Sequence, residues 1–231
     1  MKIKRPQNIP PYAEACLQAL STAGLGHHIS LGGAFALLHY HDYRTTHDID
    51  AWWQPEATAR DKEAVISTIV TTLESFGTVH IRNWQEVTSI ELDTSKRKTF
   101  SFQIASRSAQ LQPVMASPWP DIPLDSFTDL VASKMTALVE RGAPRDFVDI
   151  YTVCQASLVT PQTCWQLWQQ RQQLRRFDDD LTQAKFAVRV RLLRIEQRRP
   201  LHEIQELPAR AAAEQLRNWY KSEFLDDTND A

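Results

Sequence analysis

The amino-acid sequence predicts an α+β protein, with a small mixed β-sheet flanked by helices and then a mostly helical C-terminal lobe. In residues 28–105, segments that alternate apolar and polar residues are interspersed with segments of helical period. From Ser126 onward the period is helical throughout. The region between them is punctuated by Pro113, Pro118, Pro120 and Pro123. We therefore predict two lobes, residues 1–115 and 116–231.

The composition is that of a globular protein in a reducing cytoplasm. Of the 231 residues, 42% are hydrophobic, which is enough to bury a core. The three cysteines are scattered and form no CxxC pair, so we expect no disulfide framework. The N-terminus has no apolar signal segment, and no apolar run is long enough to cross a bilayer. We expect a cytoplasmic protein without a membrane partner, and the formal net charge of −2 does not decide among other partners.

Start and stop signals define the elements of the first lobe. Pro11 can open a first helix, which Gly24-Leu25-Gly26 would end. A short apolar strand then runs into Gly32-Gly33, and Gly77 closes a later amphipathic helix. The predicted helices are residues 12–23, 34–40 and 58–76, and the predicted strands are residues 28–31, 48–53, 79–84, 87–92 and 99–105. Because polar residues 93–98 can link a hairpin, we expect the last three strands to be antiparallel additions to the sheet.

The second lobe shows the same kind of punctuation for helices alone. Gly142-Ala143 interrupts the helical period, and Pro144 and Pro161 are suited to the first position of new helices. The predicted helices are residues 130–141, 144–154, 161–175, 189–196 and 209–224.

Residues 31–53 hold the most informative pattern, a glycine pair followed by two spaced aspartates. Asp48 and Asp50 lie two positions apart on a predicted strand, so both carboxylates point to one side. Two negative charges held so close favour a hard divalent cation, for which Mg²⁺ is the natural candidate. Gly32 and Gly33 precede a predicted helix and offer backbone N–H groups to a phosphate. Each pattern alone is common, but together on neighbouring strands they would join a phosphate site to a metal site.

The same stretch resembles the first motif of nucleotidyltransferases related to polymerase β. The resemblance rests on Gly32-Gly33 followed by Arg-x-Thr-x-Asp-Ile-Asp at residues 44–50, and it is closest to the AbiEii/AbiGii toxin family. A second match supports this narrower choice. Lys134, followed by Arg-Asp-Phe-x-Asp at residues 145–149, resembles the later Lys…Arg-Asp-x-x-Asp signature of that family. Both motifs occur in the family's order and span about residues 29–151.

This resemblance implies a fold, a reaction and a set of site residues. The first lobe would have the nucleotidyltransferase fold and would transfer an NMP from an NTP to an acceptor hydroxyl with the help of Mg²⁺. The residues implied to act in catalysis are Asp48, Asp50, Lys134 and Asp146, of which Asp48 and Asp50 would also bind the metal. The residues implied to bind substrate are Gly32, Gly33, Arg44, Thr46 and Arg145. Lys134 would contact phosphates, and Asp146 would orient the attacking group or act as the base.

A structural interpretation of the second motif stays open beside this one. Asp146 falls in the first turn of a predicted helix, where the macrodipole favours a negative charge. Asp149 lies on the same helical face and is spaced to pair with Arg145, which is worth only a few tenths of a kcal/mol. Helix capping explains Asp146 as well as catalysis does. For Lys134 the functional interpretation is the better one, because an ammonium can offset charge on a leaving pyrophosphate.

The sequence departs from the wider nucleotidyltransferase pattern at one position. Many of these enzymes carry a third carboxylate on a later strand, where this chain has Gln103. Glu91 on the preceding strand could replace it if the hairpin points it inward. The amide therefore favours, as one alternative, a weakened nucleotidyltransferase-fold protein that binds nucleotide or RNA without turnover. Another alternative is an interaction protein whose helices dock a partner.

The resemblance also implies biological partners. It predicts a toxin of a toxin–antitoxin or phage-defence system, with a cognate antitoxin and with the 3′ end of a tRNA as a candidate acceptor. Basic residues of the second lobe could neutralise RNA phosphates. They are Arg171, Arg175, Arg176, Lys185, Arg189, Arg191, Arg194, Arg198 and Arg199. A solvated helical face of mixed charge explains these residues equally well.

Two further groups of side chains invite a function. The histidines near the first motif could suggest a zinc site; they are His27, His28, His39, His41 and His47. Their spacing matches no ligand motif, so we interpret them as turn and surface residues. Tryptophans such as Trp52 could stack on a base, although packing is the more frequent use of so large a side chain.

Overall fold

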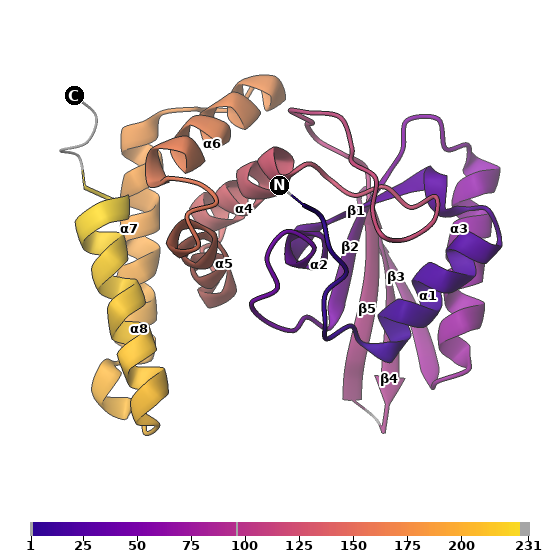
Figure 1. The fold of residues 1–231 in the computed structure, drawn as a ribbon, viewed down its shortest axis with the longest axis horizontal. Helices are drawn as coiled ribbons and strands as arrows, with labels where there is room; N and C mark the ends of the chain where they lie inside the picture. Colours follow the sequence, from indigo (N-terminus) through magenta and orange to yellow (C-terminus); the bar gives the residue numbers. More distant parts are fainter. Residues whose placement is uncertain (1, 96, 227–231) are drawn as a thin grey trace. The chain divides into compact units, whose positions relative to one another are not determined.

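The computed structural model describes residues 2–95 and 97–226, which form two compact units, Met1–Leu130 and Val131–Ala231. The predicted α+β class is confirmed, since a mixed five-stranded sheet with helices is followed by a helical region (Figure 1). The first unit contains α1 (Pro11–Thr22), η1 (Gly26–His28), β1 (Ile29–Gly32), α2 (Gly33–Leu38), β2 (Asp48–Trp53), α3 (Ala59–Glu74), β3 (Thr78–Trp84), β4 (Val87–Thr94) and β5 (Arg97–Ala105). Lys96, part of the predicted hairpin link, lies outside the described ranges.

The sheet has the strand order β1-β2-β5-β4-β3. The β3–β4 and β4–β5 pairs are antiparallel as predicted, but β5 joins β2 in parallel, so the expectation of three antiparallel additions was wrong for that contact. The cause is the number of chain reversals. Helix α3 returns the chain so that β3 runs in the direction of β2, and two hairpin turns later β5 runs in that direction again.

One face of the sheet is apolar and the other is polar. Ile49 and Ala51 of β2 are buried, and so are Phe102 and Ile104, their partners on β5. Helices α1 and α3 pack against each other, and α3 also contacts β3 and β4, which gives this unit its core (Figure 1). The opposite face carries the polar residues that alternate with these. The alternation along β2 therefore assigns its carboxylates to the face that the core does not use.

The proline-rich segment after β5 belongs to the first unit. Leu124 pairs with Met115, and it also bridges to Leu31 on β1. On either side of it, the Leu31 N–H donates to Pro123 O and the Asp125 N–H donates to Leu31 O. These hydrogen bonds hold the segment to the edge of the sheet, and the chain divides after Leu130 instead of after residue 115.

The second unit is built from helices that surround an aromatic cluster. Its elements are α4 (Phe127–Glu140), whose first turn lies in the first unit, and α5 (Pro144–Gln155), α6 (Pro161–Arg175), α7 (Leu181–Arg198), η2 (Leu201–Glu203), α8 (Leu207–Trp219) and the π-helical turn η3 (Tyr220–Phe224). The ring of Tyr220 packs against Phe147, Trp219 and Phe224. No helix in the described ranges is long and apolar enough to span a membrane.

Most predicted boundaries are shifted by one to three residues, and two elements differ by more. Helix α7 starts at Leu181, eight residues before the predicted start, because the Asp180 carboxylate caps it by accepting from the N–H groups of Thr182 and Gln183. The predicted last helix is two elements, since the α-helix ends at Trp219 and a π-helical turn follows.

His39, predicted to lie in a turn or on the surface, is instead buried at the end of α2. Its Nδ1–H donates to Phe35 O at 2.9 Å, and its Nε2 accepts from the indole N–H of Trp119 at 3.0 Å. Both ring nitrogens are thus used by one neutral tautomer. Burial, chiefly through desolvation, lowers the pKa of His39 below its usual 6.5.

We expect stability to fall on mild acidification because of His39. In the unfolded chain the imidazole takes up a proton near pH 6.5, whereas the folded pKa is lower, so the free energy of unfolding decreases as the pH falls through this window. The slope from one proton is at most about 1.4 kcal/mol per pH unit. Urea unfolding between pH 5 and 7.5 should show this fall in the free energy of unfolding, and the His39→Gln variant should have a weaker pH dependence. An unchanged slope in His39→Gln, or an equal flattening in the exposed control His47→Gln, would contradict this assignment.

Candidate functional site

The predicted metal ligands share the polar face of the sheet. On β2, Asp48 lies opposite Ser101 and Asp50 lies opposite Gln103, both on β5. Residues directly opposite each other in paired strands point to the same side. The Ser101 hydroxyl donates to Asp48 Oδ1 at 2.5 Å, which fixes that carboxylate. Two carboxylates, a hydroxyl and an amide therefore lie together on one face.

The glycine pair lies directly against this row. Gly32 is paired with Asp50 across the β1–β2 ladder, and Gly33 opens α2 with a φ of +60°. A Cβ at Gly33 would overlap the Asp50 carboxylate, and a Cβ at Gly32 would overlap the indole of Trp52. Both positions require glycine because side chains of β2 occupy the space. The structure thus brings together Gly32, Gly33, Asp48 and Asp50, as predicted from the sequence.

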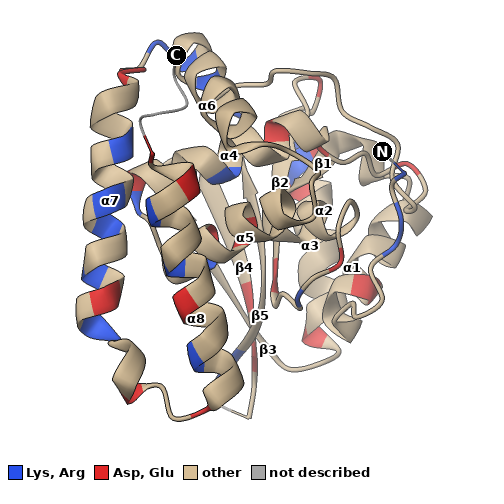
Figure 2. Ribbon diagram, turned by 60° about the vertical axis from the view of Figure 1, so that its left-hand side comes forward, with Lys and Arg blue, Asp and Glu red and all other residues tan. Residues whose placement is uncertain are grey.

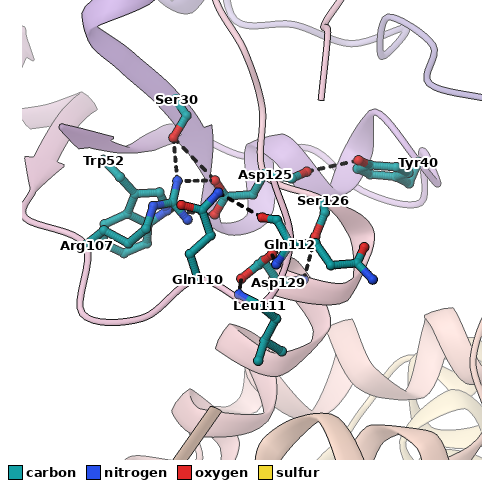
Figure 3. A network of polar contacts seen from close by, with 10 residues as sticks. All are labelled: Ser30, Tyr40, Trp52, Arg107, Gln110, Leu111, Gln112, Asp125, Ser126 and Asp129. Atoms are coloured by element: carbon teal, nitrogen blue, oxygen red, sulfur yellow. Dashed lines mark hydrogen bonds and ion pairs between the residues drawn. The ribbon is translucent and has the colours of Figure 1, made fainter. Parts of the chain in front are cut away.

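Behind the glycine pair is a buried polar network that the sequence did not reveal (Figure 3). The Trp52 indole N–H donates to Asp125 Oδ2 at 2.9 Å, and Arg107 donates to Asp125 Oδ1 at 2.6 Å. Ser30 on β1 donates to the same Oδ1 and accepts from Arg107, and the Tyr40 hydroxyl donates to the Asp125 carbonyl. Asp125 thereby holds the ring that covers Gly32, and we regard it as a positioning residue.

Burial and charge act in opposite directions on this carboxylate. Desolvation raises the pKa of Asp125, while the Arg107 guanidinium and the Trp52 N–H counter that shift. The sequence held one local sign of this network. Trp52 lies on the same strand face as Asp48 and Asp50, and an indole N–H buried there needs a hydrogen-bond acceptor. Nothing in the proline-rich segment identified Asp125 as that acceptor.

The other predicted residues of the first motif lie in the turn before β2. Thr46 is buried, and its Oγ1 lies 3.4 Å from the backbone N of Asp48, so it steadies the start of the strand. Arg44 is half-buried; it donates to Thr45 O and lies over the Tyr43 ring.

Glu91 does point to the face of Asp48, but two strands away. It pairs with Ser101, which separates it from Asp48 in the strand order, so the backbones are roughly 10 Å apart. Its carboxylate is held by Lys98 at 3.0 Å and by Arg82 at 3.2 Å. Position 103, next to Asp50, keeps its amide. Within the described ranges, no group of three His, Cys, Asp or Glu side chains is placed to hold a metal ion.

In the second unit, Lys134 forms a buried ion pair with Asp149. The Lys134 Nζ lies 2.7 Å from Asp149 Oδ2, and their side chains are 9% and 0% exposed. The lysine comes from α4 and the aspartate from α5, so the pair ties the two helices of the second motif together. A buried charge needs such a partner.

Asp146 is engaged by different groups. Arg141 donates from Nε and Nη2 to its two oxygens, both at 2.8 Å, and the Ala143 N–H donates at 3.1 Å. The carboxylate is fully buried and closes the break between α4 and α5, as the capping interpretation predicts. Arg145 is exposed. The catalytic role that the resemblance implies for Asp146 stays a prediction.

Comparison with known proteins gives a match over the part of the chain that holds both motifs. A family model described as nucleotidyl transferase AbiEii toxin, type IV toxin–antitoxin (TA) system, matches residues 15–228. The chain belongs to the AbiEii family. No curated protein matches the chain. Membership in the AbiEii family implies a nucleotidyltransferase-like toxin of a type IV toxin–antitoxin system, and with it a cognate antitoxin.

The close approach at Gly33 can be tested by adding one methyl group. Gly33→Ala should destabilise the protein by more than Gly24→Ala, because both glycines have positive φ but only the Gly33 Cβ meets other atoms. The backbone strain common to both is about 1–2 kcal/mol. Urea unfolding of the two variants measures the difference. Equal destabilisation would show that the Asp50 carboxylate does not constrain position 33.

The buried ion pair of the second unit can be tested by a double-mutant cycle. Lys134→Met leaves the Asp149 carboxylate buried without its ammonium, so we expect a loss of about 3–5 kcal/mol. The double variant Lys134→Met/Asp149→Leu should recover most of this loss, because no charge then stays buried. Urea unfolding provides all four free energies. Additive losses would contradict the pair.

Proposed function

We propose that this AbiEii-family protein is a Mg²⁺-dependent nucleotidyltransferase that transfers an NMP from an NTP to an acceptor hydroxyl. In this reaction the acceptor oxygen bonds to the α-phosphorus, the bond to pyrophosphate breaks, and the hydroxyl proton passes to a base. The observation that carries the proposal is the arrangement of Asp48 and Asp50 on one face of β2, with the backbone of Gly33 against Asp50.

The donor set on this face fits magnesium. Asp48 and Asp50 would supply carboxylate oxygens beside the amide of Gln103. Mg²⁺ is commonly bound by one or two carboxylates plus substrate phosphates. Next to Gln103, the fully buried Ser89 hydroxyl has no hydrogen-bond partner among the described residues. This face therefore carries a polar group whose hydrogen bonding the fold leaves unsatisfied. A bound ion would neutralise phosphate charge there. Asp48 and Asp50 would hold it.

The remaining residues of the motifs would bind and orient the nucleotide. Backbone N–H groups at Gly32-Gly33 would hold the triphosphate, with Arg44 and Thr46 beside the same strand. Lys134 and Arg145 would contact phosphates by their charge. Such positioning supplies most of the catalysis in phosphoryl chemistry.

For Asp146 we propose that it orients the attacking group or acts as the base. The same carboxylate also closes the helix break through Arg141, so a loss of activity in Asp146→Asn needs a comparison. Arg141→Gln removes the same ion pair and keeps the carboxylate. Greater inactivation by Asp146→Asn than by Arg141→Gln, at similar stability, supports the role as a base.

The acceptor that we propose is RNA, with a tRNA 3′ end as the first candidate, and the cytoplasm as the site of action. A second candidate function is supported by Gln103, which stands beside Asp50 where a third carboxylate would assist turnover. In that case the protein binds nucleotide or RNA without transferring an NMP.

Binding of a nonhydrolysable α,β-methylene NTP, with and without Mg²⁺, tests the site. We expect Mg²⁺-dependent binding, weakened at least tenfold in Asp48→Asn, or about 1.4 kcal/mol. The exposed Glu63→Gln on α3 is the control for removing one carboxylate and should bind as the native chain does. Incubation with four α-labelled NTPs and total RNA then measures transfer. NTP binding without label transfer from any NTP would leave the second candidate. No NTP binding would refute the transferase and the nucleotide-binding form of the second candidate.

A further inference from the structure

A groove between α5, α7 and α8 in the second unit is lined by none of the residues proposed above to bind the metal, the nucleotide or the attacking group. Its cavity volume is about 850 Å³, within the range of about 300–1,000 Å³ that is typical of ligand clefts. All the residues that line it lie between Arg141 and Arg217, inside one compact unit. We call it the arginine groove.

The floor of the arginine groove is aliphatic. On α8, the lining residues Ala209, Ala212, Ala213 and Leu216 follow the spacing i, i+3, i+4 and i+7, so they form one stripe along the helix. On α7, Leu192 and Ile195 face the same cavity. Alanine side chains leave the space beside α8 unfilled. The three helices thus present apolar stripes to a gap where a bundle would place another helix.

The charged residues of the groove lining are all basic. Six arginines line the groove: Arg141, Arg191, Arg194, Arg198, Arg199 and Arg217. No aspartate or glutamate in the described part of the chain lines it with them. Figure 2 shows Lys and Arg recurring along α7, which supplies the middle of this set.

Arg141 already pairs with Asp146, and the other five arginines differ in whether the fold uses their guanidinium groups. Arg191 packs over Gly142 and donates to the carbonyls of Val139 and Glu140, and Arg217 donates to Arg199 O. These two guanidinium groups are used by the fold itself. By contrast, the exposed Arg194 and Arg198 make no side-chain hydrogen bond or ion pair with any residue that the structure describes. They are available to a negatively charged occupant.

We infer that the arginine groove binds an acidic amphipathic α-helix of a protein partner. An apolar stripe of that helix would cover the alanines of α8 and the aliphatic residues of α7, as helix-in-groove recognition does. Glu or Asp side chains along its flanks would pair with Arg194 and Arg198. This inference does not depend on the nucleotidyltransferase reaction, because its residues lie outside the predicted metal and phosphate sites.

The floor argues against nucleic acid as the occupant. Single-stranded nucleic acid binds through phosphate contacts together with aromatic rings on which bases stack. Among the aromatic lining residues, Phe147 is 1% exposed and packs against Tyr220, which leaves Tyr151 as the accessible ring in the described lining. An RNA would leave the aliphatic stripes uncovered. A peptide helix uses both the stripes and the charges.

A designed peptide tests this inference with the full chain. The probe is a fluorescein-labelled 16-residue helix with Leu at i, i+3, i+4 and i+7 and Glu on its flanks, and its control is a scrambled peptide of the same composition. We expect saturable binding in fluorescence anisotropy, and at least tenfold weaker binding for the scrambled peptide. The Arg194→Glu/Arg198→Glu variant should also bind at least tenfold more weakly.

Two further variants separate the groove from charge in general. Arg60→Glu/Arg176→Glu makes the same change in net charge at exposed positions outside the groove and should bind within twofold of the native chain. Ala213→Trp fills the groove without changing charge and should weaken binding at least tenfold. Equal binding of both peptides, or equal weakening by the two charge-reversal pairs, would overturn the inference. So would groove variants that weaken binding of a single-stranded RNA 12-mer but not of the peptide.

Discussion

The contact between the Asp50 carboxylate and the backbone of Gly33 is the constraint on which the first unit's site depends. The β1–β2 register pairs Gly32 with Asp50, and no side chain fits at either glycine. The turn proposed to bind phosphate and the strand proposed to bind metal therefore cannot move independently. Trp52 extends this coupling, because Asp125 holds its ring over Gly32. Asp125 thus affects the site through the ring that it positions, without belonging to the predicted metal or phosphate ligands.

Features that depend on neighbours in the chain were predictable, and features that depend on distant residues were not. The bounds of β2 match the prediction, 48–53, because the alternation of residues is local. The acceptor of the Trp52 N–H lies 73 residues away in a segment without periodicity. His39 is buried by Trp119, 80 residues away. The parallel direction of β5 follows from the count of chain reversals, which periodicity does not report.

The second motif shows a related limit. Spacing along α5 predicted that Asp146 caps this helix, and the structure shows that cap. The cations that pair with the aspartates of α5 come from outside that helix. Lys134 lies within α4 and Arg141 directly follows it, and each pairs with a different aspartate of α5. A sequence motif therefore gives the residue types without saying which charge meets which. Both ion pairs join α4 to α5, and in both the carboxylate is fully buried. Removing either cation would leave a buried charge without its partner, so these residues matter for the stability of the second unit whatever chemistry they perform.

The arginines of the second unit show why counting basic residues does not define a binding surface. Arg191 belongs to α7, but its guanidinium group lies at the C-terminal end of α4 and donates to carbonyls there. A cation at this end also interacts favourably with the helix dipole, so this charge already serves the fold. Arg189 likewise donates to Leu225 O. An anionic partner can use only guanidinium groups that keep open donors, such as those of Arg194 and Arg198. Because these two arginines lie beside aliphatic stripes, the surface favours an occupant that is both acidic and apolar. A purely anionic chain would pair with the arginines but leave the aliphatic stripes exposed to water.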